Sequence, residues 1–240
     1  MPTDTKDRFT PTKRTRLKRL PQGASYERRI IYEILDEAFV CHVGFIDSDQ
    51  PVVIPTAYGR RGNMLYLHGS AASRLLRALA NRTPICVTVT LLDGLVLARS
   101  AFHHSMNYRS VVIFGAASVV KSLRQKLSAL RAISEHILRG RWADVRRPSK
   151  IELKQTLVVR LSLREASAKV RSGPPVDEEA DYNLPVWAGQ MPISLAFRKP
   201  IADSRLRPGV QTSTYIRSAR VRSLIRMSLR GSETAPRVRR

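Results

Sequence analysis

The spacing of apolar residues predicts three amphipathic helices in this chain. From Tyr26 to Ala38 they recur every three or four positions with acidic residues between them, which is the periodicity of a helix with one buried face. Ser73 to Ala80 and Leu123 to Leu138 are similar, and the apolar stripe of the later segment consists of Leu123, Leu127, Leu130 and Ile137. Ser149 and Glu152 have the spacing of a capping box, which predicts that another short helix begins there.

The other apolar runs are short and rich in β-branched residues, which predicts strands. They are Phe39 to Ile46, Val52 to Tyr58, Met64 to His68, Ile85 to Leu92, Leu95 to Phe102, Tyr108 to Val119 and Thr156 to Leu163. Asp93–Gly94, between two of these runs, is the clearest signal for a hairpin turn. Short strands joined by tight turns favour antiparallel pairing, because parallel neighbours need long crossovers. We therefore predict a mainly β chain that forms an antiparallel barrel with flanking helices.

The charge of the chain is concentrated at its ends. The 240 residues, 43% of them hydrophobic, suffice for one main domain, and the formal net charge is +23. Met1 to Arg29 holds nine basic and three acidic residues, and Arg217 to Arg240 holds eight and one. Such ends are typical of solvated or disordered tails, and the chain has no zinc-finger or RNA-recognition motif. Nucleic acid is therefore not expected as the main partner, although a cationic helix at the Arg-rich end remains an alternative.

The two cysteines and the N-terminus indicate a cytoplasmic protein. Cys41 and Cys86 each lie in an apolar run, where a free thiol behaves as a small hydrophobic group. The N-terminus is polar and basic without an apolar signal segment, and no apolar run approaches the length of a membrane span.

The turn after His68 has the features of a phosphate site. A short strand runs through His68 to Ser70, and a predicted helix opens at Ser73 and Arg74. A helix N-terminus offers N–H groups and partial positive charge to an anion, and an arginine adds a charge-assisted contact. The alternative is an ordinary strand-to-helix turn in which Ser73 is the N-cap.

A polar cluster interrupts the apolar strands later in the chain. Its members are His103, His104, Ser105, Asn107, Tyr108, Arg109 and Ser110. Polar groups beside a barrel wall need partners, and a ligand lying across the sheet could supply them through Arg109 and Ser110. The alternative is a polar loop that links two strands.

Metal and hydrolytic sites are not predicted. His103 and His104 are adjacent, so in a strand they would point to opposite faces. His42 and His68 lie in separate strands without a cysteine or carboxylate at ligand spacing. The chain also lacks a Gly-x-Ser-x-Gly elbow, a Gly-x-Gly-x-x-Gly fingerprint and a P-loop.

The chain resembles a known family through three stretches: IPTAYGRRGNMLYLHGSAASR, VTVTLLDGLVLARSAFHHSMNYRSVVIFG and EASAKVRSGPP. They are similar to the flavin-nucleotide-binding branch of the pyridoxamine 5′-phosphate oxidase-like superfamily, which includes nitroimidazole-resistance flavoproteins. The similarity runs from about Thr12 to about Gly189. It implies an antiparallel Greek-key split β-barrel and a homodimer with flavin mononucleotide (FMN) at the subunit interface. The expected organisation is a basic arm (1–25), an FMN-binding split-barrel domain (26–200) and a basic, disordered tail (201–240).

The resemblance also implies which residues bind the flavin. Thr56 would bond the edge of the isoalloxazine ring. The phosphate and ribityl chain would be held by His68, Ser70, Ser73 and Arg74. Asn107, Arg109 and Ser110 would add contacts to the phosphate from a later strand. Lys169 and Arg171 would approach the flavin or a substrate. The chain lacks the arginine-rich phosphate strand of the true oxidases, so pyridoxamine phosphate oxidation itself is not expected.

Two functions are compatible with these residues. The first is an FMN-dependent oxidoreductase that acts on a small molecule, for which the sequence assigns no catalytic residue. The second is a non-catalytic protein that binds or senses flavin, or binds haem through His68 or His103 on the same barrel.

Overall fold

The computed structural model describes residues 7–19 and 21–219, which divide into two compact units. Unit 1 contains the described residues up to 91 together with 108–171. Unit 2 contains residues 92–107 and the described residues from 172 onwards. Among the described residues, no helix is both long and apolar enough to cross a membrane.

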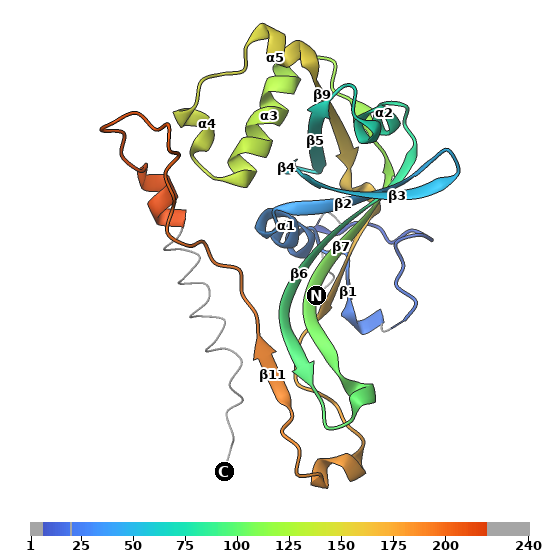
Figure 1. Ribbon diagram of the computed structural model, residues 1–240. Coiled ribbons are helices and arrows are strands. Elements are labelled where there is room, and N and C mark those ends of the chain that lie inside the picture. Colours follow the sequence, from blue (N-terminus) through green and yellow to red (C-terminus); the bar gives the residue numbers. More distant parts are fainter. Residues whose placement is uncertain (1–6, 20, 220–240) are drawn as a thin grey trace. The chain divides into compact units, whose positions relative to one another are not determined.

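Two β-sheets form the framework (Figure 1). The larger sheet has the strand order β1-β10-β7-β6-β2-β3, and β11 pairs with β6. Its strands are β1 (Ala24–Ser25), β10 (Ala166–Arg171), β7 (Ser105–Ala116), β6 (Pro84–Leu97), β2 (Val40–Asp47), β3 (Gln50–Ala57) and β11 (Gly189–Pro192). The smaller sheet has the order β4 (Gly59–Arg61), β5 (Met64–Ser70), β9 (Thr156–Ser162) and β8 (Ser118–Val119).

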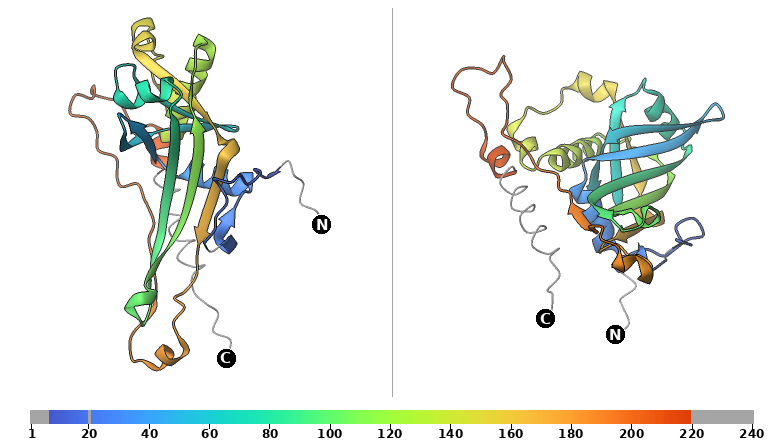
Figure 2. Two further views of the ribbon diagram at one scale, coloured as in Figure 1. Left: turned by 90° about the vertical axis from the view of Figure 1, so that its right-hand side faces the viewer. Right: turned by 60° about the horizontal axis from the view of Figure 1, so that its bottom comes forward.

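The pairing of strands in unit 1 is antiparallel, as the short turns predicted. β2 and β3 form a hairpin in which Val43 lies opposite Ile54. In the smaller sheet, β5 and β9 pair with Leu65 opposite Leu161. Figure 2 shows the sheets of unit 1 curving around a common interior. The predicted antiparallel barrel is therefore confirmed.

Helices flank the sheets near the predicted positions. They are α1 (Arg28–Glu37), α2 (Arg74–Ala80), α3 (Leu123–Ile137), α4 (Arg141–Asp144) and α5 (Lys150–Gln155). The capping box of α5 is present, because Ser149 and Glu152 each accept a hydrogen bond from the other's backbone N–H. The four-residue helix α4 was not predicted, since it is too short to show a periodic apolar pattern.

The core of unit 1 is continuous between the two sheets and the helices. Ile31, Ile34 and Leu35 of α1 are fully buried in the same cluster as Val43 of β2 and Leu161 of β9. The apolar faces predicted from periodicity thus meet in one interior, and their burial is the main favourable term in folding.

A glycine allows α3 to lie directly on the smaller sheet. A Cβ atom on Gly59 of β4 would be 2.6 Å from the backbone nitrogen of Ile133 and 2.7 Å from the carbonyl carbon of Ala132. Any larger residue would push the helix away from the strand, so this contact requires glycine.

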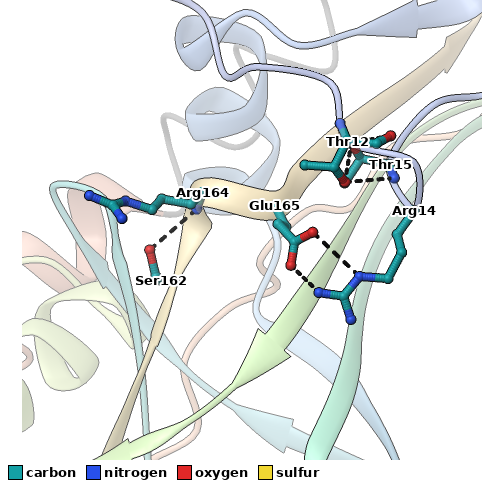
Figure 3. A network of polar contacts seen from close by, with 6 residues as sticks. All are labelled: Thr12, Arg14, Thr15, Ser162, Arg164 and Glu165. Carbon is teal, nitrogen blue, oxygen red and sulfur yellow. Dashed lines mark hydrogen bonds and ion pairs between the residues drawn. The ribbon is translucent and has the colours of Figure 1, made fainter.

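The predicted solvated arm is folded where it is described. Phe9 is buried in the core cluster, and the Tyr26 hydroxyl donates to the Thr15 carbonyl at 3.1 Å. Arg14 forms an ion pair with Glu165, which follows β9, and Thr12 and Thr15 bond one another beside it (Figure 3). The number of charges in the arm did not predict that it packs on the barrel. Burial of the Phe9 ring stabilises the packed arm more than hydration of its charged side chains favours a solvated one.

The predicted hairpin at Asp93–Gly94 is wrong. β6 continues through both residues, and the chain turns only around the short 3₁₀ segment η3 (Ala101–His103). Gly94 lies opposite Pro192 of β11, and a Cβ on it would be 2.9 Å from the Met191 carbonyl oxygen. The glycine therefore serves close approach of a third strand rather than a turn.

Part of the polar cluster lies in a strand instead of a loop. β7 begins at Ser105, so Asn107, Arg109 and Ser110 are all strand residues. The polar-loop alternative applies only to the residues before Ser105.

Unit 2 is held together by a buried carboxylate. Asp177 accepts hydrogen bonds from the backbone N–H groups of Arg99 and Ser100 and pairs with the Arg99 guanidinium at 3.2 Å. After β11 the chain is extended, and residues 214–219 are helical. Of the tail predicted to be disordered (201–240), residues 220–240 lie outside the described residues.

Candidate functional site

The turn from β5 to α2 is bonded within itself. Ser73 is the N-cap of α2, and its hydroxyl accepts the Leu76 N–H at 3.1 Å. The Ser70 hydroxyl accepts the Ala72 N–H at 3.2 Å. The capping role is thus confirmed for Ser73, and phosphate contacts by the two serines stay a prediction.

Arg74 reaches solvent from the first turn of α2. Its side chain is more than half exposed, and its Nε lies 3.7 Å from a carboxylate oxygen of Asp47. An exposed pair of this length is weak, so the guanidinium can exchange Asp47 for a bound anion at little cost.

His68 carries an unsatisfied ring nitrogen. Its Nδ1 is buried and has no hydrogen-bond partner among the described residues. Burial lowers the pKa of the ring below its ordinary value, so the neutral form is favoured. A buried polar atom without a partner is costly in a native protein, and a bound ligand is one group that could satisfy it.

Arg109 and Ser110 are both engaged by neighbouring elements. The Arg109 guanidinium donates to both carboxylate oxygens of Glu37, at the end of α1, at 2.8 and 3.0 Å. Ser110 lies opposite Lys169 of β10, and its hydroxyl donates to the Lys169 carbonyl at 3.4 Å. Phosphate binding by Arg109 would therefore compete with Glu37 or use the remaining N–H groups.

Asn107 belongs to unit 2. Its Nδ2 donates to the Gly173 carbonyl at 3.1 Å and to the Gln190 side-chain oxygen at 2.6 Å. Both amide hydrogens thus hold the segment after β10, and contact with a flavin stays a prediction.

Thr56 of β3 lies opposite Cys41, a buried residue of β2. Its hydroxyl donates to the Ala57 carbonyl at 3.3 Å, and the Cys41 thiol donates to the Thr56 carbonyl at 3.6 Å. Burial raises the pKa of Cys41 to about 12, so this thiol is not a nucleophile at neutral pH. A bond from Thr56 to the flavin ring also stays a prediction.

The structure brings some of these residues together and leaves others apart. His68, Ser70, Ser73 and Arg74 share one strand end and the following turn. Ser110 and Lys169 are cross-strand neighbours. Thr56 lies three strand positions from β7 in the sheet order, which is about 14 Å at the usual spacing of ~4.8 Å.

The two histidines of the polar cluster have partners within unit 2. His104 Nδ1 accepts the Ala98 N–H at 3.2 Å, and His103 Nε2 lies 3.6 Å from a carboxylate oxygen of Glu178. Among the described residues, no group of three His, Cys, Asp or Glu side chains is arranged to hold a metal ion.

Two acidic partners were missed by sequence reasoning. Glu37 binds Arg109 across 72 positions, and Asp177 binds Arg99 across 78. Neither pair has a local spacing that could have revealed it.

Apolar side chains are exposed on the β2–β3 hairpin of unit 1. Val40 and Ile46 of β2 and Val53 of β3 are exposed, and Val53 lies opposite Gly44 in the hairpin. Isolated exposed apolar residues are normal, but a group on neighbouring strands indicates contact with a ligand or partner.

Residues 27–170 match the protein-family model described as pyridoxamine 5′-phosphate oxidase. The chain belongs to the pyridoxamine 5′-phosphate oxidase family. The split barrel of this family is the fold that unit 1 shows. A comparison with curated proteins finds no match.

Two solved structures are similar over most of the chain. The flavocytochrome Anf3 from Azotobacter vinelandii is 40% identical, with a TM-score of 0.83, over 88% of this chain and 99% of its own. The FAD and heme binding protein from Mycobacterium smegmatis is 32% identical, with a TM-score of 0.79, over 82% and 97%. Because the family model ends at Val170, both matches must include part of the segment that follows it.

Proposed function

We propose that this member of the pyridoxamine 5′-phosphate oxidase family is a flavin-binding redox protein, an oxidoreductase acting on a small molecule. The observation that carries the proposal is the 40% identity to a flavocytochrome across 88% of the chain. The lack of an assigned acid or base is compatible with it, because the cofactor supplies hydride and electron chemistry and the protein supplies orientation and electrostatics.

The residues present fit a flavin nucleotide. His68 offers a buried ring nitrogen without a partner, and Arg74 offers a guanidinium held only by a weak exposed pair. Lys169, beside Ser110, adds positive charge on β10. In this proposal Arg74 neutralises phosphate charge, Lys169 approaches the flavin or a substrate, His68 bonds the ribityl chain or phosphate, and the apolar strand faces exclude water from the ring.

The family resemblance of the sequence implies FMN as the flavin, whereas the name of one relative gives FAD. Both share the isoalloxazine ring and the first phosphate, so the residues above serve either. Heat release of the bound flavin followed by chromatography against both standards decides between them.

Haem binding beside the flavin is the second candidate function. It is favoured by the names of the two relatives and by the unpartnered His68 nitrogen. His104 is a poor iron ligand through Nε2, because its Nδ1 accepts a backbone N–H and the neutral ring then carries its proton on Nε2. His68 and His103 remain the candidates.

Homodimer formation and a cytoplasmic location belong to the same proposal. In unit 1 the exposed Val40, Ile46 and Val53 supply an apolar face for a second copy. In unit 2, the large side chains of Phe102 and Trp187 are exposed, and a second copy would cover them. The two cysteines are free thiols, as a reducing compartment would keep them.

The test is an absorption spectrum of the purified protein with added FMN, FAD or haem. Flavin bands that remain after gel filtration, and reduction by a nicotinamide cofactor followed by turnover of an acceptor, are the expected results. A colourless protein that retains none of the three contradicts the proposal, and binding without turnover supports the non-catalytic alternative. Sedimentation analysis of the same sample reports the oligomeric state.

A further inference from the structure

The charge outside the chain ends gathers on one set of helices. Residues 121–164 contain twelve Lys or Arg and three Asp or Glu, and this segment includes α3, α4 and α5. Figure 1 shows the three helices side by side next to the smaller sheet of unit 1. Lys126 of α3 donates to the Leu153 carbonyl of α5, which links the first and last of them.

The three acidic residues of this segment are already used by local bonds. Glu135 accepts the N–H groups of Gly140 and Trp142 at 2.8 and 3.0 Å. Glu152 pairs with Arg146 at 2.6 Å, and Asp144 pairs with Arg141 at 3.6 Å. Between residues 123 and 155, six exposed basic side chains lie outside these ion pairs and are called the basic platform here: Arg124, Arg131, Arg139, Arg147, Lys150 and Lys154.

Apolar side chains are also exposed on the helices that carry the basic platform. The stripe of α3 predicted to face the core is only partly buried, because the helix packs through Ala129 and Ile133. Leu123 is 59% exposed and Ile137 is 49% exposed, and Ile151 of α5 is 69% exposed. Helical surfaces that combine cations with exposed aliphatic residues have the composition of interfacial membrane-binding helices.

We propose that the basic platform and these aliphatic side chains bind the surface of an anionic lipid membrane. Clusters of four to eight basic residues on an amphipathic helical surface match the negative potential of acidic lipids. The aliphatic residues would enter the boundary between headgroups and acyl chains, while the cations contact lipid phosphates. Binding of this kind is peripheral and reversible, and it needs no membrane-spanning helix.

Other occupants fit this surface less well. A second copy meeting the same face would place like charges opposite one another. Single-stranded nucleic acid is bound by aromatic stacking, but the one aromatic ring of residues 121–164 apart from His136 is Trp142, which is buried. Protein interfaces favour aromatic anchors over Leu, and the exposed apolar residues of this surface are Leu and Ile.

The test is sedimentation of the full chain with vesicles. One set is pure phosphatidylcholine, and in the other about a third of the lipid is phosphatidylglycerol. We expect binding to the anionic set alone, weakening as salt rises. The double variant Arg124→Gln/Arg131→Gln should bind about 25-fold more weakly, because each lost charge should cost about fivefold in affinity. Leu123→Ser/Ile151→Ser should weaken binding without a change of charge.

The matched control is Arg8→Gln/Arg29→Gln, which removes two exposed charges from another part of unit 1. It should bind like the unaltered chain, and the basic C-terminal residues are the same in every sample. All substituted side chains are exposed, so urea unfolding midpoints should agree between variants. Equal binding to both vesicle sets, or no loss in either test pair, overturns the proposal. Binding to duplex DNA instead of vesicles, lost in the platform variant, also overturns it.

Discussion

Arg109 of β7 and Glu37 at the end of α1 form an ion pair with two hydrogen bonds, 2.8 and 3.0 Å long. Both side chains are mostly shielded from water, so the pair joins the first helix to the barrel wall. Charge-assisted bonds of this kind are stronger than neutral ones. The residue that the sequence suggested as a phosphate ligand therefore has a structural role.

The coupling between these two residues can be measured. We expect Arg109→Gln and Glu37→Gln each to lower the free energy of unfolding, because each leaves a shielded charge without its partner. In a double-mutant cycle followed by urea unfolding, the coupling should be about 1–2 kcal/mol. Additive effects of the two substitutions would contradict the pair.

Gly59 should tolerate no side chain. Gly59→Ala would place Cβ 2.6 Å from the backbone of α3, so we expect a loss of about 1–3 kcal/mol in unfolding free energy from overpacking. Gly44→Ala is the matched control, since its Cβ would meet its nearest atom at 3.5 Å. Urea unfolding measures the difference in unfolding free energy between the two variants. Equal stabilities would mean that α3 can move away from β4 without cost.

Gly94 should be needed for the pairing of β11. A side chain there would lie 2.9 Å from the Met191 carbonyl oxygen, so Gly94→Val should displace the strand. Faster amide hydrogen exchange in residues 189–193 is the expected result. Thr90→Ala, an exposed position in the same strand, serves as the control. Unchanged exchange in Gly94→Val would mean that the approach of β11 is not close.

Stability should fall as the solution becomes acidic. Burial lowers the pKa values of His68 and His136 in the folded protein. In the unfolded chain these rings titrate near about 6.5, so below that pH the unfolded state binds more protons. The free energy of unfolding should stay constant with respect to these two groups above about pH 6.5 and decrease as the pH falls below that value. His136→Gln should reduce this slope, as measured by urea unfolding at a series of pH values.

Arg74 tests the proposed phosphate contact. Removal of one charge-assisted bond by Arg74→Ala should weaken flavin binding by about 10- to 100-fold, measured by fluorescence titration. Arg77→Ala, an exposed arginine later in the same helix, should have little effect. Full affinity in Arg74→Ala would place the phosphate elsewhere.

Local patterns were sufficient for most elements of unit 1. The positions of α1, α3 and the β2–β3 hairpin followed from periodicity and turn residues, and the caps at Ser73 and Ser149 followed from spacing. These features depend on interactions within a few residues, which a sequence displays directly. The barrel followed because short antiparallel strands must close or be covered to bury one face.

The tertiary structure decided what depends on distant partners. Asp93–Gly94 has the composition of a turn, but β11, about a hundred positions later, pairs beside it and keeps the strand extended. Arg109 has the charge of a phosphate ligand, but only the fold reveals that Glu37, 72 positions away, pairs with it. Sequence alone determined the longer helices, most strands of unit 1 and the caps at Ser73 and Ser149, since those depend on neighbours in the chain. Contacts between residues far apart in sequence decided which residues pair with buried charges and whether a turn-like dipeptide forms a turn. No local spacing in the sequence reveals such contacts.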